Sequence, residues 1–257
     1  MNIGFFGDSY VDLDLDFHTA RAQEDPPDVS RKSLSWGWRL CNDLEYTPIN
    51  SGLSGSNQFY SIKSFQDLIL AGGTVDYAIF TFTWDFRLYG KGNFHHVLRN
   101  LNQNTADIRK SLPFTEDQVD WDIDELILAG RLYYKFLSDE EQSHFIHELL
   151  IKWILELPEQ YPNTRFIFLP NTEFSREIAL KHFKKGILLD FAFENISLLE
   201  GEHVGVDPYY PYYNIKFGHM TDPNHERFKD LTKNIIINYN TYEDKVYPVD
   251  YEQFRID

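Results

Sequence analysis

Three side chains have the types that nucleophilic catalysis needs. Ser9 follows a short apolar run in GFFGDSY, and Asp222 and His225 stand three residues apart in MTDPNHERF. A serine hydroxyl is a weak nucleophile until a base removes its proton, and a histidine oriented by a carboxylate is such a base. Near a helix start, positions i and i+3 point the same way, so Asp222 can orient His225. These residues predict a Ser–His–Asp site.

Each of these residues also has a simpler interpretation. A serine after a glycine is commonly a turn residue, and Asp222 can serve only as the N-cap of the last helix. A lone histidine before a helix is commonly a cap or a surface residue. The catalytic interpretation therefore requires that the fold bring all three together.

The elements that must position these residues alternate between strands and helices. Strands are expected at 2–6, within 46–58, at 75–84 and at 164–170, and helices at 33–44, 58–71, 138–160 and 223–240. Residues 186–200 read as a strand or a strand followed by a helix, and residues 241–257 as an irregular surface tail. This alternation predicts an α/β fold, a three-layer α/β/α sandwich with a mostly parallel central sheet. We expect one domain over 1–257, with 92–160 a mainly helical insertion.

Ligands of parallel sheets bind outside the carboxyl ends of the strands. Ser9, the 52–57 loop and residues 83–85 each follow a predicted strand, so we expect them to meet at one edge. The helix at 138–160 is expected to begin with a Ser138–Glu141 capping box and to end at Pro158. Its buried face is predicted by apolar spacing to comprise Phe145, Leu149, Trp153 and Leu157.

The composition of the chain limits the classes of molecule that it is expected to bind. The net charge is −16, from 24 basic and 40 acidic residues, which disfavours nucleic acid and anionic membranes and suits a neutral substrate such as a sugar or an ester. Aromatic residues make up 16% of the chain, and the surplus can line a pocket. The single cysteine, Cys41, excludes an internal disulfide and is expected to be a buried small hydrophobe.

Neither a secretory signal nor an apolar stretch long enough to span a membrane is recognised, so the cytoplasm is the expected compartment. A viral or non-classically exported protein would have the same features. The sequence leaves the oligomeric state open.

No metal or other cofactor is predicted. The Asp-Leu-Asp-Leu-Asp run at 12–16 lacks the glycine and the final glutamate of an EF-hand loop. His95 and His96 are adjacent and face apart on a helix, and His144 and His147 are better explained as a helix-surface pair than as metal ligands.

Three motifs, in order, resemble those of the SGNH (GDSL-type) hydrolases: FFGDSY near the start, NSGLSGSNQ some forty residues later, and DPNH near the end. The resemblance implies that Ser9 is the nucleophile, that Asp222 and His225 complete the triad, and that the N–H groups of Ser9 and Gly55 bind the oxyanion. Gly55 can also be only a turn glycine.

One motif departs from the family. Where the family has Gly-x-Asn-Asp after the third strand, this chain has Phe82, Thr83, Trp84 and Asp85, so the asparagine that donates to the oxyanion is replaced by Trp84. Asn57, Thr83, Trp84 and Arg87 are candidates for the missing donor, and losing one donor costs roughly 10²–10³ in rate.

The resemblance implies hydrolysis or transfer of an ester-linked acyl group, with O-acetyl carbohydrates as the expected substrates. Candidate substrate-binding residues are Asp85, Arg87, Tyr209 and Tyr210, the tyrosines lying in a DPYYPYY stretch that can equally be a packed loop. The alternative function is a catalytically weakened glycan-binding or assembly module.

Overall fold

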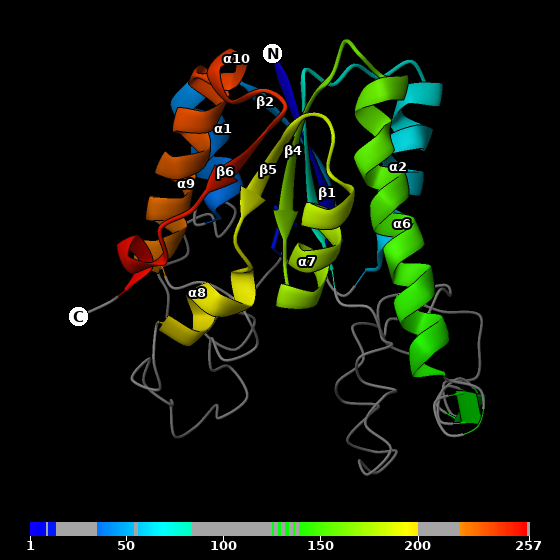
Figure 1. Cartoon of the computed structure of the whole chain (residues 1–257). Helices are drawn as coiled ribbons and strands as arrows, with labels where there is room; N and C mark the ends of the chain where they lie inside the picture. The colour runs from blue at the N-terminus through cyan, green and yellow to red at the C-terminus, as the bar shows by residue number, and fades with distance from the viewer. Residues whose placement is uncertain are drawn as a thin grey trace.

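A computed structural model describes residues 1–8, 10–13, 35–53, 56–83, 139–199 and 222–255, with residues 125, 128–129, 132–133 and 136. The described residues contain a sheet of six parallel strands in the order β2-β1-β3-β4-β5-β6 (Figure 1). The α/β fold class predicted from the sequence is thereby confirmed. The strands are β1 Asn2–Gly7, β2 Thr47–Gly52, β3 Tyr77–Phe82, β4 Arg165–Pro170, β5 Ile187–Asp190 and β6 Lys245–Pro248.

Helices cover both faces of the sheet and form the outer layers (Figure 1). One core, which includes Ile3, Phe5 and Ile79, packs under α1, α8 and α9, and the other, which includes Phe6 and Phe80, packs under α2, α6 and α7. The helices are α1 Trp36–Leu44, α2 Gln58–Leu70, α6 Glu140–Gln160, α7 Glu173–His182, α8 Phe193–Leu199, α9 Asp222–Ile237, α10 Tyr239–Tyr242 and the 3₁₀ helix η5 Tyr251–Phe254.

The central strands β1, β3 and β4 are mainly apolar because both of their faces are buried. Side chains alternate along a strand, so Phe5 contributes to the first core and its neighbour Phe6 to the second, and both are fully buried. This two-sided burial explains the uninterrupted apolar runs at β1, β3 and β4.

Helix α6 differs from its prediction in three respects. Its N-cap is Asp139, whose side chain accepts from the Gln142 N–H, and Pro158 lies inside the helix, which continues to Gln160. Phe145, Leu149 and Trp153 are 62%, 48% and 40% exposed, so the predicted buried face is wrong except for Leu157. The side chains that pack inward are His147, Leu150, Ile151, Ile154, Leu155, Leu157 and Pro158. The helix is apolar on two sides, and only packing against α2 and α7 selects between them.

The C-terminal residues are more regular than expected. Instead of an irregular tail, they include β6, which pairs in parallel with β5 from Ile187↔Lys245 to Asp190↔Pro248. The 186–200 segment is a strand followed by a helix, β5 and α8, and helix α7 was not predicted at all. No helix among the described residues is both long and apolar enough to cross a membrane.

Candidate active site

The candidate site lies where the sheet order reverses. From β1 the chain forms β2 on one side and β3 on the other, and ligands of parallel sheets bind at such a point, beyond the carboxyl ends of the strands. Four candidate catalytic or oxyanion residues and the four candidate substrate-binding residues lie, wholly or by their side chains, outside the described parts of the chain. They are Ser9, Gly55, Trp84, the side chain of Asp222, Asp85, Arg87, Tyr209 and Tyr210.

The residues on either side of Ser9 form a tightly bonded turn. The fully buried Asp8 carboxylate accepts the Tyr10 N–H at 3.2 Å and the Asn171 side-chain amide at 3.0 Å. The Asp8 carbonyl accepts the N–H groups of Val11 and Asp12 at 3.1 and 3.0 Å. The first motif is therefore a compact turn directly after β1.

This turn requires glycine at position 7, because a side chain there would collide with its neighbours. The φ of Gly7 is +154°, and a Cβ would come within 1.8 Å of Thr81 Oγ1. The Gly7 carbonyl accepts the Leu53 N–H at 2.9 Å and the Ser56 hydroxyl at 2.8 Å. Residues flanking Gly55 are thus held against the first motif, as predicted for the 52–57 loop.

Thr83, directly after β3, joins that end of the sheet to α2 and α7. Its hydroxyl donates to Gln58 Oε1 at 3.0 Å, and its carbonyl accepts from Gln58 Nε2 at 3.0 Å and from the Ser175 hydroxyl at 3.2 Å. Thr83 is fully buried. In this arrangement the hydroxyl proton of Thr83 points to Gln58.

Asn57 caps helix α2. Its Oδ1 accepts the Tyr60 N–H at 3.0 Å, as an N-cap side chain should, and the residue is only 7% exposed. This bond sets which end of the amide is the acceptor, and the Nδ2 group is the donor end. Asn57 precedes Gln58, so it adjoins the contact with Thr83.

His225 is linked to the first motif through Trp36. The Trp36 N–H donates to His225 Nδ1 at 3.3 Å, and the Trp36 indole N–H donates to the Tyr10 carbonyl at 2.8 Å. Trp36 is the first residue of α1, where a backbone N–H has no partner within the helix. Phe228, one turn after His225, packs edge-on against the indole at 4.9 Å. Trp36 therefore connects His225 to Tyr10, the residue after Ser9.

The Trp36 bond also defines the state of the imidazole. A nitrogen that accepts a hydrogen bond carries no proton, so the neutral ring has its proton on Nε2. Asp222 is the first residue of α9 rather than the residue before it, and it stands on the same helix three positions ahead of His225.

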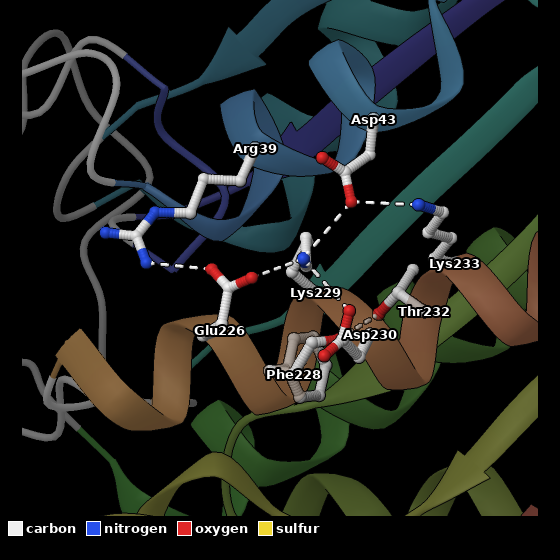
Figure 2. A network of polar contacts seen from close by, with 8 residues as sticks. All are labelled: Arg39, Asp43, Glu226, Phe228, Lys229, Asp230, Thr232 and Lys233. Atoms are coloured by element: carbon white, nitrogen blue, oxygen red, sulfur yellow. Dashed lines mark hydrogen bonds and ion pairs between the residues drawn. The ribbon is translucent and has the colours of Figure 1, made fainter.

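A cluster of charges fastens α9 to α1 close to His225 (Figure 2). Arg39 pairs with Glu226 at 3.0 Å, and Lys229 and Lys233 contact Asp43 at 3.1 and 2.9 Å. Lys229 also pairs with Glu226 and is nearly buried. Lys233 and Lys229 lower the pKa of the Asp43 carboxyl, and Lys229 and Arg39 lower the pKa of the Glu226 carboxyl. Burial opposes the charge on Lys229, but its carboxylate partners outweigh that effect and raise its pKa.

The histidines considered for metal binding have other contacts. His147 is fully buried, with Nε2 3.2 Å from the Ser175 hydroxyl, and His144 packs on Phe174. Within the described part of the chain, no three His, Cys, Asp or Glu side chains converge as metal ligands. His95 and His96 lie outside that part. Cys41 is buried as expected, and burial raises the pKa of its thiol to about 12.

The contacts that connect the motifs were not predicted from the sequence. Trp36, Gln58 and Asn171 each bond to a different motif residue. Gln58 and Trp36 are the first residues of their helices, which is a signal available in the sequence. Asn171 follows a strand at the carboxyl edge of the sheet, and this position also could have identified it.

No protein-family profile and no curated protein sequence matches the chain. Among solved structures, it is similar to a protein of the G-D-S-L lipolytic family from Desulfitobacterium hafniense DCB-2, with 13% identity, a TM-score of 0.41, and coverage of 91% of this chain and 98% of that one. An α/β hydrolase from the metagenome of Lake Arreo, Spain, has 12% identity, a TM-score of 0.37 and coverage of 70% and 73%. A carbohydrate esterase whose active site shows divergent catalytic and non-catalytic binding functions has 13% identity, a TM-score of 0.42 and coverage of 93% and 64%. The three motifs of the chain resemble those of SGNH (GDSL-type) hydrolases, and the solved structures to which it is similar include a G-D-S-L protein and a carbohydrate esterase.

Proposed function

We propose that the chain is a serine esterase that cleaves or transfers an ester-linked acyl group. One observation carries the proposal: Trp36 donates both to His225 and to the carbonyl of Tyr10, the residue after Ser9. Trp36 thereby binds His225 of the last motif through its backbone N–H and the turn of the first motif through its indole N–H. This shared attachment supports the convergence that a serine nucleophile and its base require.

In the proposed reaction, Ser9 Oγ attacks the acyl carbon while His225 takes the hydroxyl proton. The tetrahedral intermediate expels the alcohol, which leaves with the proton that His225 returns. Water or a second alcohol then attacks the acyl-serine, again losing a proton to His225, and the acyl product departs as Ser9 is reprotonated. Asp222 orients the ring and stabilises the imidazolium.

Proton transfer from Ser9 requires a ring nitrogen without a proton. In the tautomer that accepts the Trp36 N–H, that nitrogen is Nδ1. We infer that the Trp36 bond is given up as the proton arrives, or that the ring turns over so that Nε2 becomes the base and Nδ1–H faces Asp222. In both cases, the imidazolium and the Trp36 bond exclude each other.

For the oxyanion, we propose three donors: the N–H groups of Ser9 and Gly55 and the side-chain amide of Asn57. Asn57 replaces the family asparagine, whose position Trp84 occupies. The support is that Asn57 Oδ1 is bound to the Tyr60 N–H, which leaves Nδ2 as the donor end, whereas the Thr83 hydroxyl donates to Gln58. On the basis of the sequence, Arg87 and Trp84 remain alternative candidates for the oxyanion donor.

We propose an O-acetyl group on a carbohydrate as the substrate. The support is the chain's net charge of −16, which favours a neutral ligand, together with its high aromatic content. Asp85, Arg87, Tyr209 and Tyr210 would contact the sugar.

The rival function is a glycan-binding or assembly module with little catalysis. Two observations favour it: Trp84 stands where the family has its oxyanion asparagine, and the Thr83 hydroxyl points to Gln58 rather than serving as a substitute donor. This rival requires neither a reactive Ser9 nor a basic His225.

A serine-directed fluorophosphonate probe distinguishes the two functions. If the chain is an esterase, the probe labels the wild-type protein but not Ser9→Ala. If glycan binding does not depend on catalysis, the wild type and Ser9→Ala bind a neutral glycan equally. Hydrolysis of p-nitrophenyl acetate compared with longer esters then measures the acyl pocket. Equal, minimal labelling of wild type and Ser9→Ala would overturn the esterase and favour the module.

A further inference from the structure

Asn171 stands at the end of β4, on the edge of the sheet where the motifs meet. It is 1% exposed, and its backbone is bonded on both sides: its N–H to the Phe82 carbonyl and its carbonyl to the Glu194 N–H, each at 3.0 Å. Its side-chain Nδ2 donates to Asp8 Oδ2 at 3.0 Å. A rigid position on β4 is therefore connected to the residue before Ser9.

The Asp8 carboxylate in turn spans Ser9. Its Oδ1 accepts the N–H of Tyr10, two residues on, as in an Asx-turn, and lies 3.5 Å from the Thr81 hydroxyl. Asp8 is fully buried, and a buried carboxylate has to be held by hydrogen-bond donors. Its orientation consequently determines the backbone on both sides of Ser9.

Among the described residues, the side-chain amide of Asn171 bonds only to Asp8. Its Oδ1 is buried and has no hydrogen-bond partner in the described part of the chain. A buried polar atom without a partner is unfavourable, yet turning the amide over would direct Oδ1 at the Asp8 carboxylate, acceptor against acceptor. The bond to Asp8 explains why the side chain keeps this orientation.

We propose that Asn171 is a positioning residue for the nucleophile and acts through Asp8. This inference rests on the proposed function, because it assigns Asn171 to the turn that presents Ser9. The side chain does not touch the substrate. It donates to one oxygen of the Asp8 carboxylate, whose other oxygen accepts the Tyr10 N–H. The Ser9 hydroxyl is thereby held in one geometry.

The first test removes the donor. In Asn171→Leu, we expect kcat for p-nitrophenyl acetate to fall about 10²-fold with KM within threefold of wild type, since small misplacements of a reacting group cost about that much. Amide exchange at Tyr10 should quicken. The matched control is Thr164→Val, which removes a side-chain hydrogen bond, to the Val75 carbonyl, at the opposite end of the same strand. It should lower the melting temperature without lowering kcat.

The second test replaces the Asn171 amide by a carboxyl group of nearly the same shape. In Asn171→Asp, two carboxyl groups face each other, so the pKa of the new group is raised. Only its protonated form donates to Asp8, the one titratable side chain bonded to Asn171 among the described contacts. The ratio of variant to wild-type kcat should therefore rise as the pH falls, a change that a purely space-filling role would not produce.

The outcomes separate the two claims. If Ser9→Ala is inactive while Asn171→Leu keeps kcat within twofold and Tyr10 exchange is unchanged, the positioning role is overturned and the esterase stands. A flat pH ratio for folded Asn171→Asp also overturns the positioning role. If Ser9→Ala is as active as wild type, the proposed function and this inference both fail.

Discussion

The backbone N–H of Trp36 and the Nδ1 atom of His225 are hydrogen-bonded at 3.3 Å, although the two residues are 189 positions apart. The bond supplies a partner for an N–H that helix α1 cannot satisfy internally. It also ties the ionisation of His225 to the attachment of α1, because an imidazolium has no acceptor nitrogen to offer.

Two substitutions at His225 separate these roles. His225→Asn places Oδ1 near the position of Nδ1, so it keeps an acceptor for Trp36 but cannot take a proton. We expect its thermal stability to match wild type while esterase activity falls roughly 10²–10⁴-fold. His225→Ala should lose the activity and also about 1 kcal/mol of stability, through the unpaired N–H. Thermal melts and kinetics of the two variants check this, and an active His225→Asn contradicts the assignment of the base.

Asn57 offers a similar separation. Asn57→Asp keeps a side-chain oxygen for the Tyr60 N–H but removes the amide donor, so it should fold normally and lose about 10²–10³ in kcat. Asn57→Ala should in addition lose about 1 kcal/mol of stability with the helix cap. Steady-state kinetics and denaturant unfolding measure both effects. Wild-type kcat in Asn57→Asp would limit Asn57 to capping α2.

Gly7 should tolerate no side chain. In Gly7→Ala, the Cβ would meet Thr81 Oγ1 at 1.8 Å, and φ is +154°, so we expect a loss on the order of 3 kcal/mol or more from crowding and backbone strain. The matched control is Gly72→Ala, which also has a positive φ but has no atom within 4 Å of the added Cβ. It should cost only about 1 kcal/mol. Chemical denaturation of the two variants gives the comparison.

The charge cluster between α1 and α9 should make stability depend on acid. The pKa values of Asp43 and Glu226 are lower in the folded chain than in the unfolded one. Their contribution is therefore complete above the ordinary carboxyl pKa of about 4 and is lost as the pH falls through the lowered folded values. Melting temperatures measured from pH 6 to pH 3 should decline accordingly.

Lys229→Met tests the source of that decline. Asp43 keeps Lys233 and Glu226 keeps Arg39, so neither carboxylate is left unpaired, and we expect less than about 1 kcal/mol of change at pH 7. The acid decline should become shallower, because the two carboxyl pKa values move back toward normal. Lys63→Met, which removes an exposed pair with Asp67, is the control. An unchanged acid profile in Lys229→Met would contradict the role of Lys229.

The sequence predicted the sheet better than the surface that covers it. Strands buried on both faces, such as β1 and β4, are predicted by their apolar runs. The motifs that directly follow predicted strands are therefore expected at one edge of the sheet. Helix α6 was placed correctly, but its buried face was not, because the exposed Phe145, Leu149 and Trp153 recur at helical spacing just as the buried Ile151 and Ile154 do. Strand β6 is only four residues long, lies at the sheet edge and is mostly exposed, so its local sequence signal is weak.

The candidate site was predicted through its motif residues but not through their supports. Ser9 and His225 were identified by type and spacing. The contacts of Trp36 with His225 and Tyr10, and of Asn171 with Asp8, are long-range and depend on the strand order. A buried asparagine after a strand has no periodic signal, so only the three-dimensional arrangement reveals its partner.

The late position of His225 in the chain has a consequence for biosynthesis. Helix α9 docks on α1 only after β3, β4 and β5 have been made, since all of these precede it in the chain. A nascent polypeptide thus contains Ser9 long before His225 is made, and under the proposed function its serine has no base until α9 has been synthesised.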